Sequence, residues 1–374
     1  MPRPAHRLRA LVVAMTAVLV AVALAGCGSA GETDTTTTAV RAAPALSSVT
    51  PLKDPRSWTG DVTARIAHPE VDPVAHDPRS HLPVTLKDAQ GTSVTVKDTS
   101  RILALDVYGT YARTVYELGL GSHLVGRDVS TQFAEAKHLP LVTTQGHELN
   151  AEAILKLDPT VVIVDSTLGP WDVVLQLRAS GIPVVVLPAT RSLNNIGTLT
   201  RDVARALGVP AAGAKLAHRI DTAVDRAETA VQAVAPRSTA AKLRTIFLYV
   251  RGKSGVYYMF GEGSGADSLI DALGLYDVAG EIGWKGMKPV TDEGIVAAQP
   301  DLILMMTDGL ASVGGVDGLL HRLPALAQTP AGENHRIVDM ADSEILGFGP
   351  LSASVLNALA VAIYAPQAVV KKSS

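Results

Sequence analysis

The sequence predicts an α/β fold in which two Rossmann-like lobes, each built on a central parallel sheet, are joined by one long rigid helix. Short uninterrupted runs of aliphatic residues alternate with segments of helical period, as is typical of parallel strands that are covered on both faces. A unit of one helix and one strand occurs twice, and a single long amphipathic segment lies between the two copies. We therefore expect a ligand to bind in the cleft between the lobes, outside the ends of the strands.

The predicted strands begin with a hairpin. Residues 83–97 alternate apolar and polar side chains around the turn Asp88-Ala89-Gln90-Gly91, which is the pattern of two antiparallel strands. We expect an N-terminal lobe over residues 82–208 and a C-terminal lobe over residues 237–366, followed by a tail over 367–374. Their buried strands are predicted where short apolar runs occur: 102–107, 161–164, 184–187, 245–250, 302–306 and 336–340.

The repeated unit gives the two lobes one plan. Residues 152–163, which begin Glu-Ala-Ile, recur as residues 293–304, which begin Glu-Gly-Ile, so that equivalent positions are 293 − 152 = 141 residues apart. A second echo pairs the Leu-Gly-Leu sequence at 118–120 with the same sequence at 273–275. Chance similarity of two helix-and-strand units is the alternative to a true repeat.

A single amphipathic helix is predicted between the lobes, over residues 209–236. Pro210 suits its first turn and Pro236 ends it. At 1.5 Å per residue such a helix is on the order of 35 Å long, which makes it a stiff strut rather than a flexible linker. Its apolar residues follow one another at steps of three and four: Leu216, Ile220, Val224, Ala227, Val231 and Val234.

The first 26 residues have the order of a secretory signal: Arg3, Arg7 and Arg9, an uncharged apolar run over 10–25, and small residues at its end. The chain's single cysteine, Cys27, follows Leu-Ala-Gly, which resembles the lipobox of a bacterial lipoprotein, in which the thiol is diacylated. An uncleaved transmembrane helix is the alternative, but sixteen apolar residues fall short of the roughly 20 that span a bilayer. We expect an extracytoplasmic protein anchored to the cell membrane by lipidated Cys27, because two acyl chains anchor stably.

Residues 27–81 are predicted to be the lipidated end and a flexible tether, because they are rich in Thr, Pro, Ser and Asp and show no apolar period. A partly ordered collar is the alternative. Removing the signal takes the formal net charge from −3 to −6, which argues against nucleic acid as a partner. With the one cysteine committed to lipid, stability depends on a large apolar core rather than on disulfides.

Together, the motifs of residues 82–366 resemble the class III substrate-binding proteins of ABC importers, which serve vitamin B12, ferric siderophores and haem. The hairpin over 88–96 with Arg101 is similar to the first hairpin of that family, and Gly-Glu-Gly-Ser-Gly at 261–265 resembles the loop before the first helix of its second lobe. Segments 150–159 and 292–300 resemble its two lobe motifs. The resemblance implies a monomeric binding protein that is no enzyme and passes its ligand to a permease, whose separate ATPase supplies the energy.

In that family one glutamate of each lobe motif docks onto arginines of the permease. By position, the resemblance assigns this role to Glu152 and Glu293. Two exposed carboxylates, one on each lobe, could straddle a two-fold permease. The alternative is that each glutamate only favours the N-terminus of a helix, which contributes under about 1 kcal/mol.

Three polar residues are candidates for the ligand site. His147 lies on a loop just ahead of the first lobe motif, and Tyr249 and Arg251 close the strand predicted over 245–250. Because side chains two apart in a strand point the same way, Tyr249 and Arg251 share a side. A guanidinium beside the phenol favours phenolate, and tyrosine and histidine both serve as axial ligands of haem. Taken singly, such a histidine is usually solvated and such a tyrosine usually belongs to the core.

The stretch also resembles the haem-importing members of the family, in which a histidine before the first lobe motif and a Tyr-x-Arg in the second lobe hold the iron. This resemblance implies that His147 and Tyr249 ligate ferric haem b, one from each lobe, and that Arg251 supports the tyrosine. Candidates for contacts with the propionates and the macrocycle stay open: Arg191, Lys253, Lys285 and Lys288 for the former, and Met259, Phe260 and Trp284 for the latter.

Other ligands and functions remain as alternatives. A siderophore or a corrinoid could bind to the same fold, although 4% aromatic content weakens the siderophore case. A zinc or manganese site needs about four converging ligands, whereas the histidines are scattered. An extracellular hydrolase is the alternative from another class, but Ser264 lies in Gly-Glu-Gly-Ser-Gly, which is not a nucleophile elbow.

Overall fold

The structure is a computed structural model of the 374-residue chain, and it describes residues 41–144 and 146–370. All of these residues belong to one compact unit. The predicted signal over 1–26, Cys27 and the first part of the predicted tether lie outside the described residues. Among the residues that are described, no helix is both long enough and apolar enough to cross a membrane.

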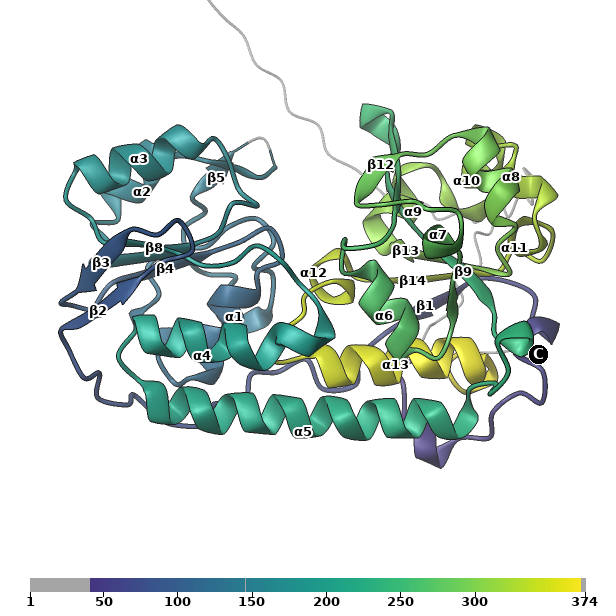
Figure 1. The fold of residues 1–374 in the computed structure, drawn as a ribbon, viewed down its shortest axis with the longest axis horizontal. Helices are drawn as coiled ribbons and strands as arrows, with labels where there is room; N and C mark the ends of the chain where they lie inside the picture. The colour runs from purple at the N-terminus through teal and green to yellow at the C-terminus, as the bar shows by residue number, and fades with distance from the viewer. Residues whose placement is uncertain (1–40, 145, 371–374) are drawn as a thin grey trace, which may run out of the picture. The chain divides into compact units, whose positions relative to one another are not determined.

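The N-terminal lobe is built on a three-stranded parallel sheet in the order β4-β7-β8 (Figure 1). Every residue of these strands is buried, and successive side chains enter two different cores, one on each face of the sheet. This arrangement explains why the strands are uninterrupted apolar runs. The strands are β4 (Ile102–Leu105), β7 (Val161–Val164) and β8 (Val184–Val186), and the helices are α1 (Thr110–Glu117), α2 (Ala151–Lys156), α3 (Trp171–Ala179) and α4 (Ile196–Ala206).

Two hairpins accompany this sheet. The predicted first hairpin pairs β2 (Val84–Lys87) with β3 (Ser93–Val96), and the Asp88 side chain accepts the N–H groups of Gln90 and Thr92 in the turn. A shorter hairpin joins β5 (Thr143–Thr144) to β6 (Glu148–Leu149) just before α2.

The C-terminal lobe contains a larger mixed sheet in the order β1-β14-β13-β9-β10-β12, with β11 beside β9. In this order β1, β14, β13 and β9 are parallel to one another. β10 and β12 extend the sheet in antiparallel pairing, which the sequence analysis did not predict. The strands are β1 (Val62–Ala64), β9 (Arg244–Arg251), β10 (Val256–Phe260), β11 (Tyr276–Asp277), β12 (Met287–Pro289), β13 (Leu302–Met306) and β14 (Ile337–Met340). The helices are α6 (Ala266–Ala272), α7 (Val278–Glu281), α8 (Asp292–Ala298), α9 (Thr307–Ser312), α10 (Gly315–Arg322), α11 (Pro330–Glu333), α12 (Asp342–Ile345) and α13 (Ser352–Tyr364).

The predicted repeat has matching local structure in both lobes. The Asn150 side chain accepts the Ala153 N–H at 3.0 Å at the start of α2, and the Thr291 side chain accepts the Gly294 N–H at 3.1 Å at the start of α8. After each helix a non-glycine residue has a positive φ, 44° in one copy and 40° in the other, at positions that are again 141 apart. Shared caps and shared turns at equivalent positions support one structural plan rather than chance similarity.

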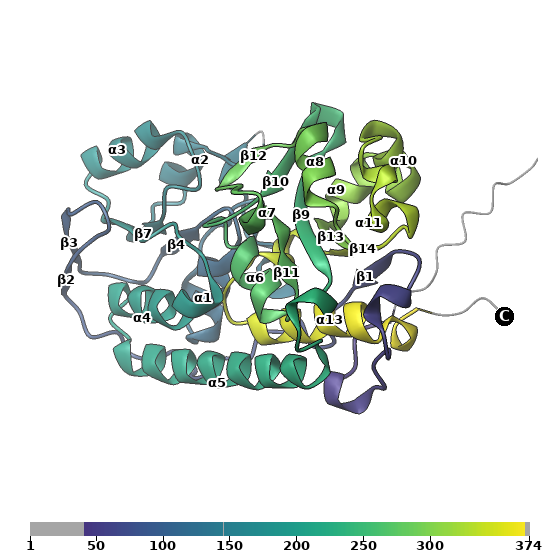
Figure 2. The same cartoon turned by 45° about the vertical axis from the view of Figure 1, so that its right-hand side comes forward.

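The predicted connecting helix is α5 (Pro210–Val234), 25 residues long, with Pro210 in its first turn. At 1.5 Å per residue it is about 37 Å long. It packs against α4 of the N-terminal lobe and against α13 of the C-terminal lobe, as both ribbon views show (Figures 1 and 2). Its side chains at Leu216, Ile220, Val224 and Val231 are buried, which confirms the predicted apolar stripe.

The prediction of a flexible tether is wrong for residues 41–81. This segment supplies β1, the edge strand that pairs with β14, and then runs along the N-terminal lobe, where the Val74 N–H donates to the Glu117 carbonyl at 2.8 Å. Its apolar residues follow no period because it lies across several elements rather than forming one. The buried side chains are Ala43, Leu46, Val62, Ala64, Ile66 and Val74.

The predicted tail also begins too early. Val369 is buried, and its carbonyl accepts the Arg41 N–H at 3.1 Å, so the two ends of the described chain are bonded to each other. The C-terminal lobe therefore extends beyond residue 366.

We expect a chain that begins at residue 82 to be markedly less stable than one that begins at residue 41. The shorter chain loses an edge strand and six buried apolar side chains. Full burial of one larger aliphatic side chain contributes about 1.5–3 kcal/mol, so the free energy of unfolding should fall by at least about 4 kcal/mol. Urea unfolding of both chains, followed by circular dichroism, measures the difference, and equal midpoints would contradict the structural role of residues 41–81.

Candidate functional site

Tyr249 and Arg251 lie at the carboxyl end of β9 and share one side of the strand, as the alternation of side chains predicts. The Arg251 guanidinium carbon lies 4.4 Å from the centre of the Tyr249 ring. Both side chains are only half-buried, so a ligand can reach them. Among the described residues Arg251 makes no hydrogen bond to the Tyr249 hydroxyl, and its positive charge faces the ring instead.

A carboxylate that the sequence analysis missed holds this guanidinium. Asp342, in the first turn of α12, accepts a hydrogen bond from Arg251 Nη2 at 2.5 Å and another from the Asp308 N–H at 3.0 Å. Burial raises the pKa of Asp342, and the charge of Arg251 opposes that rise. Asp342 thus fixes the position of Arg251 from a strand end 91 residues away, and only the fold brings the two together.

His147 lies in the turn between β5 and β6 of the N-terminal lobe. The residue is exposed, yet enough protein surrounds the imidazole to lower its pKa, first through desolvation and second through the positive charge of Arg251. His147 thus lies on the N-terminal lobe, whereas Tyr249 and Arg251 lie on the C-terminal lobe. A lowered pKa keeps the imidazole neutral, and the neutral form is the one that binds a metal.

The sheet around Tyr249 presents an aromatic face. The rings of Tyr249 and Phe260 are stacked with centroids 5.9 Å apart, and Tyr258 is the cross-strand partner of Tyr249. Met287 on the edge strand pairs with Phe260 and is 54% exposed. Because directly paired residues point to the same face of a sheet, these side chains form one surface beside Tyr249.

Two of the macrocycle candidates belong elsewhere. Met259 is fully buried on the opposite face of the sheet, since it alternates with Phe260. The Trp284 indole packs close to Gly294 of α8, and its N–H donates to the Met259 carbonyl at 2.9 Å. Phe260 is thus the one of these three that lies on the face of Tyr249.

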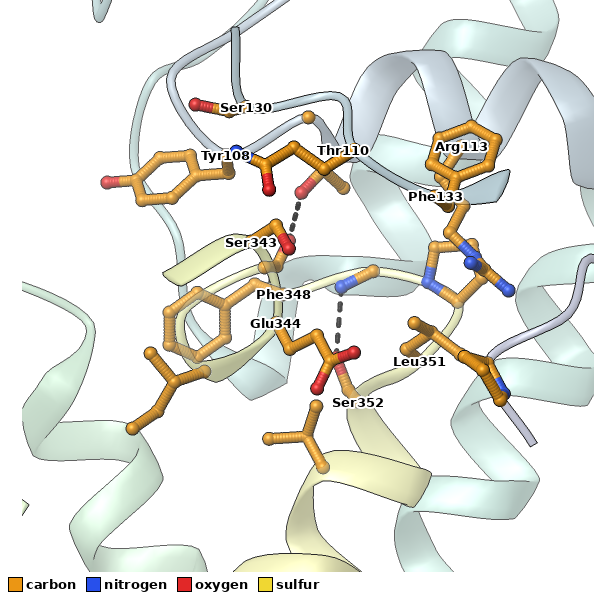
Figure 3. A pocket seen from close by; sticks show the side chains of 18 of the residues that line it. Tyr108, Thr110, Arg113, Ser130, Phe133, Ser343, Glu344, Phe348, Leu351 and Ser352 are labelled. Atoms are coloured by element: carbon orange, nitrogen blue, oxygen red, sulfur yellow. Dashed lines mark hydrogen bonds between the residues drawn. The ribbon is translucent and has the colours of Figure 1, made fainter. Parts of the chain in front are cut away.

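A cavity of about 350 Å³ is lined mainly by the segments that follow β4 and β14 (Figure 3). It takes its walls from both lobes, and the Thr110 hydroxyl donates to the Gly347 carbonyl across it. Neither His147 nor Tyr249 lines this cavity. The labelled lining residues are Tyr108, Thr110, Arg113, Ser130, Phe133, Ser343, Glu344, Phe348, Leu351 and Ser352.

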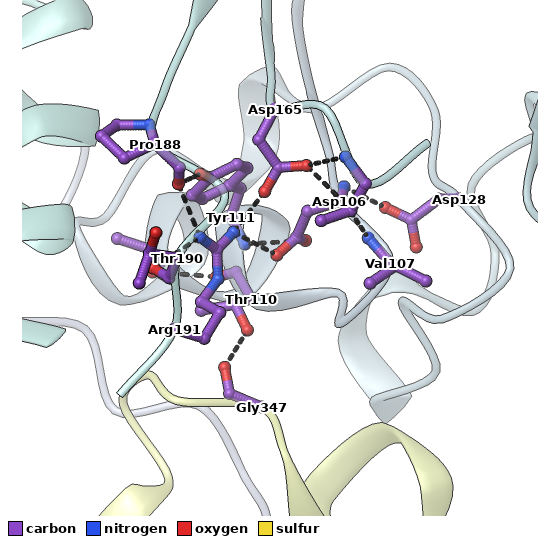
Figure 4. Close-up of polar contacts among 12 residues, drawn as sticks. Asp106, Val107, Thr110, Tyr111, Asp128, Asp165, Pro188, Thr190, Arg191 and Gly347 are labelled. Carbon is purple, nitrogen blue, oxygen red and sulfur yellow. Dashed lines mark hydrogen bonds and ion pairs between the residues drawn. The ribbon is translucent and has the colours of Figure 1, made fainter. Parts of the chain in front are cut away.

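Arg191 is not available for a propionate, which corrects one of the candidates. It is buried and bonded to Asp165 at 2.5 Å and to Asp106 at 3.2 Å, and it also donates to the Pro188 carbonyl at 2.7 Å (Figure 4). Its guanidinium lies between these groups and the ring of Tyr111, with 4.8 Å from its carbon to the ring centre. Arg191 therefore ties together the ends of β4 and β7 and the loop after β8.

The carboxylates of this cluster outnumber its cation. Burial raises the pKa of Asp106 to about 7, the Arg191 charge opposes the rise, and Asp165 and Asp128 add to it. Burial likewise raises the pKa of Asp128 to about 6. Since these carboxylates are buried, protonation of Asp106 or Asp128 relieves the mutual repulsion near neutral pH.

Glu152 and Glu293 lie in the first turns of α2 and α8, at equivalent positions of the repeat, and both are exposed. Within the described part of the chain neither carboxylate forms an ion pair. No group of three His, Cys, Asp or Glu side chains among the described residues could hold a metal ion.

Two lobes on a stiff helix, with polar groups from both lobes near one space, define a two-lobed ligand-binding protein. The family model of the periplasmic binding proteins matches residues 107–344, so the chain belongs to the periplasmic binding protein family. It is accordingly an extracytoplasmic binding protein of the ABC-importer type and not an enzyme.

Solved structures agree with this membership. The haem-binding protein HmuT is 41% identical, with a TM-score of 0.79, over 84% of this chain and all of HmuT. The periplasmic haem-binding protein RhuT from Roseiflexus sp. RS-1, in its apo form, is 36% identical with a TM-score of 0.65, over 71% of this chain and 98% of RhuT. BhuT, solved in complex with two haems, is 30% identical with a TM-score of 0.62, over 70% of this chain and 97% of BhuT.

Three further HmuT structures carry single alanine substitutions at a histidine, a tyrosine and an arginine, and the tyrosine stands two residues before the arginine. No curated protein matches the chain.

We expect Asp106→Asn to reduce the pH dependence of stability. A carboxyl group whose pKa is raised in the folded state binds a proton that the unfolded state lacks, here between about pH 4 and pH 7. Its contribution to the free energy of unfolding therefore falls as pH rises through that interval. Urea unfolding at about pH 5 and about pH 7.5 measures the slope, with Asp172→Asn on the exposed side of α3 as control. If Asp106→Asn shows the same change in unfolding free energy between the two pH values as the wild type, the raised pKa of Asp106 is contradicted.

Proposed function

We propose that the chain captures ferric haem b between its lobes and delivers it to the permease of an ABC importer. The observation that carries the proposal is the half-exposed pair of Tyr249 and Arg251 at the carboxyl end of β9, with the guanidinium over the ring. His147 lies in an exposed turn of the other lobe, so a flat ligand held between the lobes would meet a phenol on one side and an imidazole on the other.

In this proposal His147 and Tyr249 are the axial ligands of one haem. Phenol is a poor ligand near neutral pH because its ordinary pKa is about 10, whereas phenolate is a hard anion that suits ferric iron. The Arg251 cation above the ring stabilises the phenolate, and Asp342 keeps the cation in that position. Such an arrangement supports the tyrosine without requiring a hydrogen bond to its oxygen.

The surroundings of Tyr249 suit a macrocycle. Phe260, Tyr258 and Met287 offer aromatic and thioether surface on the same sheet face, which can pack against the edge of a porphyrin. Lys285 is bonded to Glu262 at 3.2 Å and Lys288 lies over the Trp284 ring, so Lys253, in the exposed turn after Arg251, is the better partner for a propionate.

The relatives support haem as the ligand, because HmuT, RhuT and BhuT are each described as haem-binding proteins. The substituted tyrosine and arginine of HmuT have the same spacing as Tyr249 and Arg251. A ferric siderophore or a corrinoid is the alternative ligand, since the fold alone accommodates either.

Delivery needs an anchor and a docking surface. We assign the anchor to lipidated Cys27, which follows the predicted signal over residues 1–26. We assign docking to Glu152 and Glu293, whose exposed carboxylates lie on different lobes. The protein acts as a monomer in this scheme, and each lobe supplies one contact.

We expect residues 41–374 to bind one equivalent of ferric haem in a visible-absorption titration. His147→Ala and Tyr249→Phe should each weaken binding by at least about tenfold and shift the Soret band, because each removes one axial ligand. Arg251→Ala should weaken haem binding less than Tyr249→Phe does, because it removes a supporting cation rather than an axial ligand. If the absorption spectrum of the wild type shows no saturable change, haem is excluded as the ligand, and siderophores and corrinoids should be tested next.

We expect charge reversal at both docking positions, Glu152→Lys together with Glu293→Lys, to abolish haem uptake by cells that depend on this importer. The variant should still bind haem in the titration, because both residues are exposed and neither is a proposed ligand residue. Uptake that survives the double reversal would contradict the docking role while leaving haem binding intact.

A further inference from the structure

Exposed apolar side chains occur on, or on segments next to, the helices of the two proposed docking glutamates. Within the described residues four large hydrophobic side chains are exposed: Leu141 (45%), Leu175 (51%), Met287 (54%) and Val296 (50%). The cross-strand pairing of Met287 with Phe260 places it on the sheet face of Tyr249 and so assigns it to the ligand site. The other three, Leu141, Leu175 and Val296, are not among the residues assigned to that site.

In the C-terminal lobe the apolar residue lies on the docking helix itself. Val296 follows Glu293 by three positions in α8, and residues three apart lie on the same side of a helix. Gly294, Ile295 and Ala298 face the core, which leaves Glu293 and Val296 together on the outer side of α8.

In the N-terminal lobe the apolar residues flank the docking helix. Leu175 lies on the exposed side of α3, which packs against α2, the helix of Glu152. Leu141 precedes Val142, whose carbonyl accepts the N–H of Asn150, the residue that caps α2. In Figure 1, α2 and α3 of one lobe and α8 of the other lie on the side of their lobes away from α5.

We propose that the permease recognises a mixed surface on each lobe, in which an aliphatic side chain beside the glutamate inserts into an apolar depression next to the permease cation. This inference rests on the proposed function, and it assigns to apolar contacts the part of the docking affinity that the charges do not supply. An exposed ion pair contributes little net affinity, whereas apolar side chains that become fully desolvated at the centre of an interface carry much of it. The glutamates then steer association, and Val296 and Leu175, with Leu141 at the edge, slow dissociation.

The occupant is the extracytoplasmic face of the permease rather than a second copy of this chain. Two exposed carboxylates on separate lobes call for cations on the partner, and a second copy would bring the same carboxylates into opposition. Their equivalent positions in the repeat, 141 residues apart, suit a partner with two-fold symmetry.

The test measures binding kinetics of the haem-loaded chain, residues 41–374, on the haem importer of the same organism held in lipid nanodiscs. Val296→Ser and Leu175→Ser should each raise the dissociation rate about tenfold and change the association rate by less than about twofold. Glu152→Gln with Glu293→Gln should instead lower the association rate and remove its dependence on salt. Ala233→Ser, on the exposed side of α5, is the control and should match the wild type.

Serine variants that dissociate like the wild type, or that only slow association, would overturn the inference. A haem titration on each variant verifies that the fold and the ligand site are intact. If the wild type binds haem and the importer while the serine variants are unaffected, only the apolar contacts are wrong. If the wild type does not bind the importer at all, the proposed delivery function is wrong as well.

Discussion

The spacing between the lobes is the constraint on which the rest of the structure depends. α5 packs against α4 of one lobe and α13 of the other, so bending between the lobes would expose apolar side chains at both contacts. The segment over residues 41–81 adds a second connection, because it supplies β1 to the C-terminal sheet and then bonds to α1 of the N-terminal lobe. Since His147 and Tyr249 come from different lobes, a ligand site between them exists only while this spacing is maintained.

Two arginines at strand ends show how burial decides the role of the same chemical group. Arg191 is enclosed by Asp106, Asp165 and the Tyr111 ring, and all of its bonded partners belong to the N-terminal lobe. The buried carboxylates neutralise its charge, and this interaction holds the strand ends together. Removing Arg191 would leave buried carboxylates unpaired. Arg251 has one carboxylate partner and remains half-exposed, so its charge still acts on Tyr249 and on His147.

Local patterns were enough to predict the elements that form within one stretch of chain. The apolar runs of the strands, the stripe of α5 and the repeat around Glu152 and Glu293 all depend on nearby residues, and the structure has each of them. Contacts between distant segments were missed. β1 pairs with β14 across 276 residues, and Asp342 meets Arg251 across 91, and neither leaves a periodic signal. Tyr249 and Arg251 were placed on one side by the two-residue period of a strand, whereas Arg191 was misjudged because its burial is set by tertiary packing.

Placing one axial ligand on each lobe makes the affinity for haem depend steeply on the distance between the lobes. In the proposed scheme both iron bonds act across the same gap, so a small separation or rotation lengthens at least one of them. Direct hydrogen bonds between the lobes include Thr110 to Gly347 and Leu193 to Ser268, which is a modest barrier to such a movement. If the permease docks at α2 and α8 as proposed, its contacts would act on the sides of both lobes that lie away from α5. In the proposed scheme the stiff connection would hold the site together in the free protein, and simultaneous docking of both lobes would be needed to change the spacing and release the ligand.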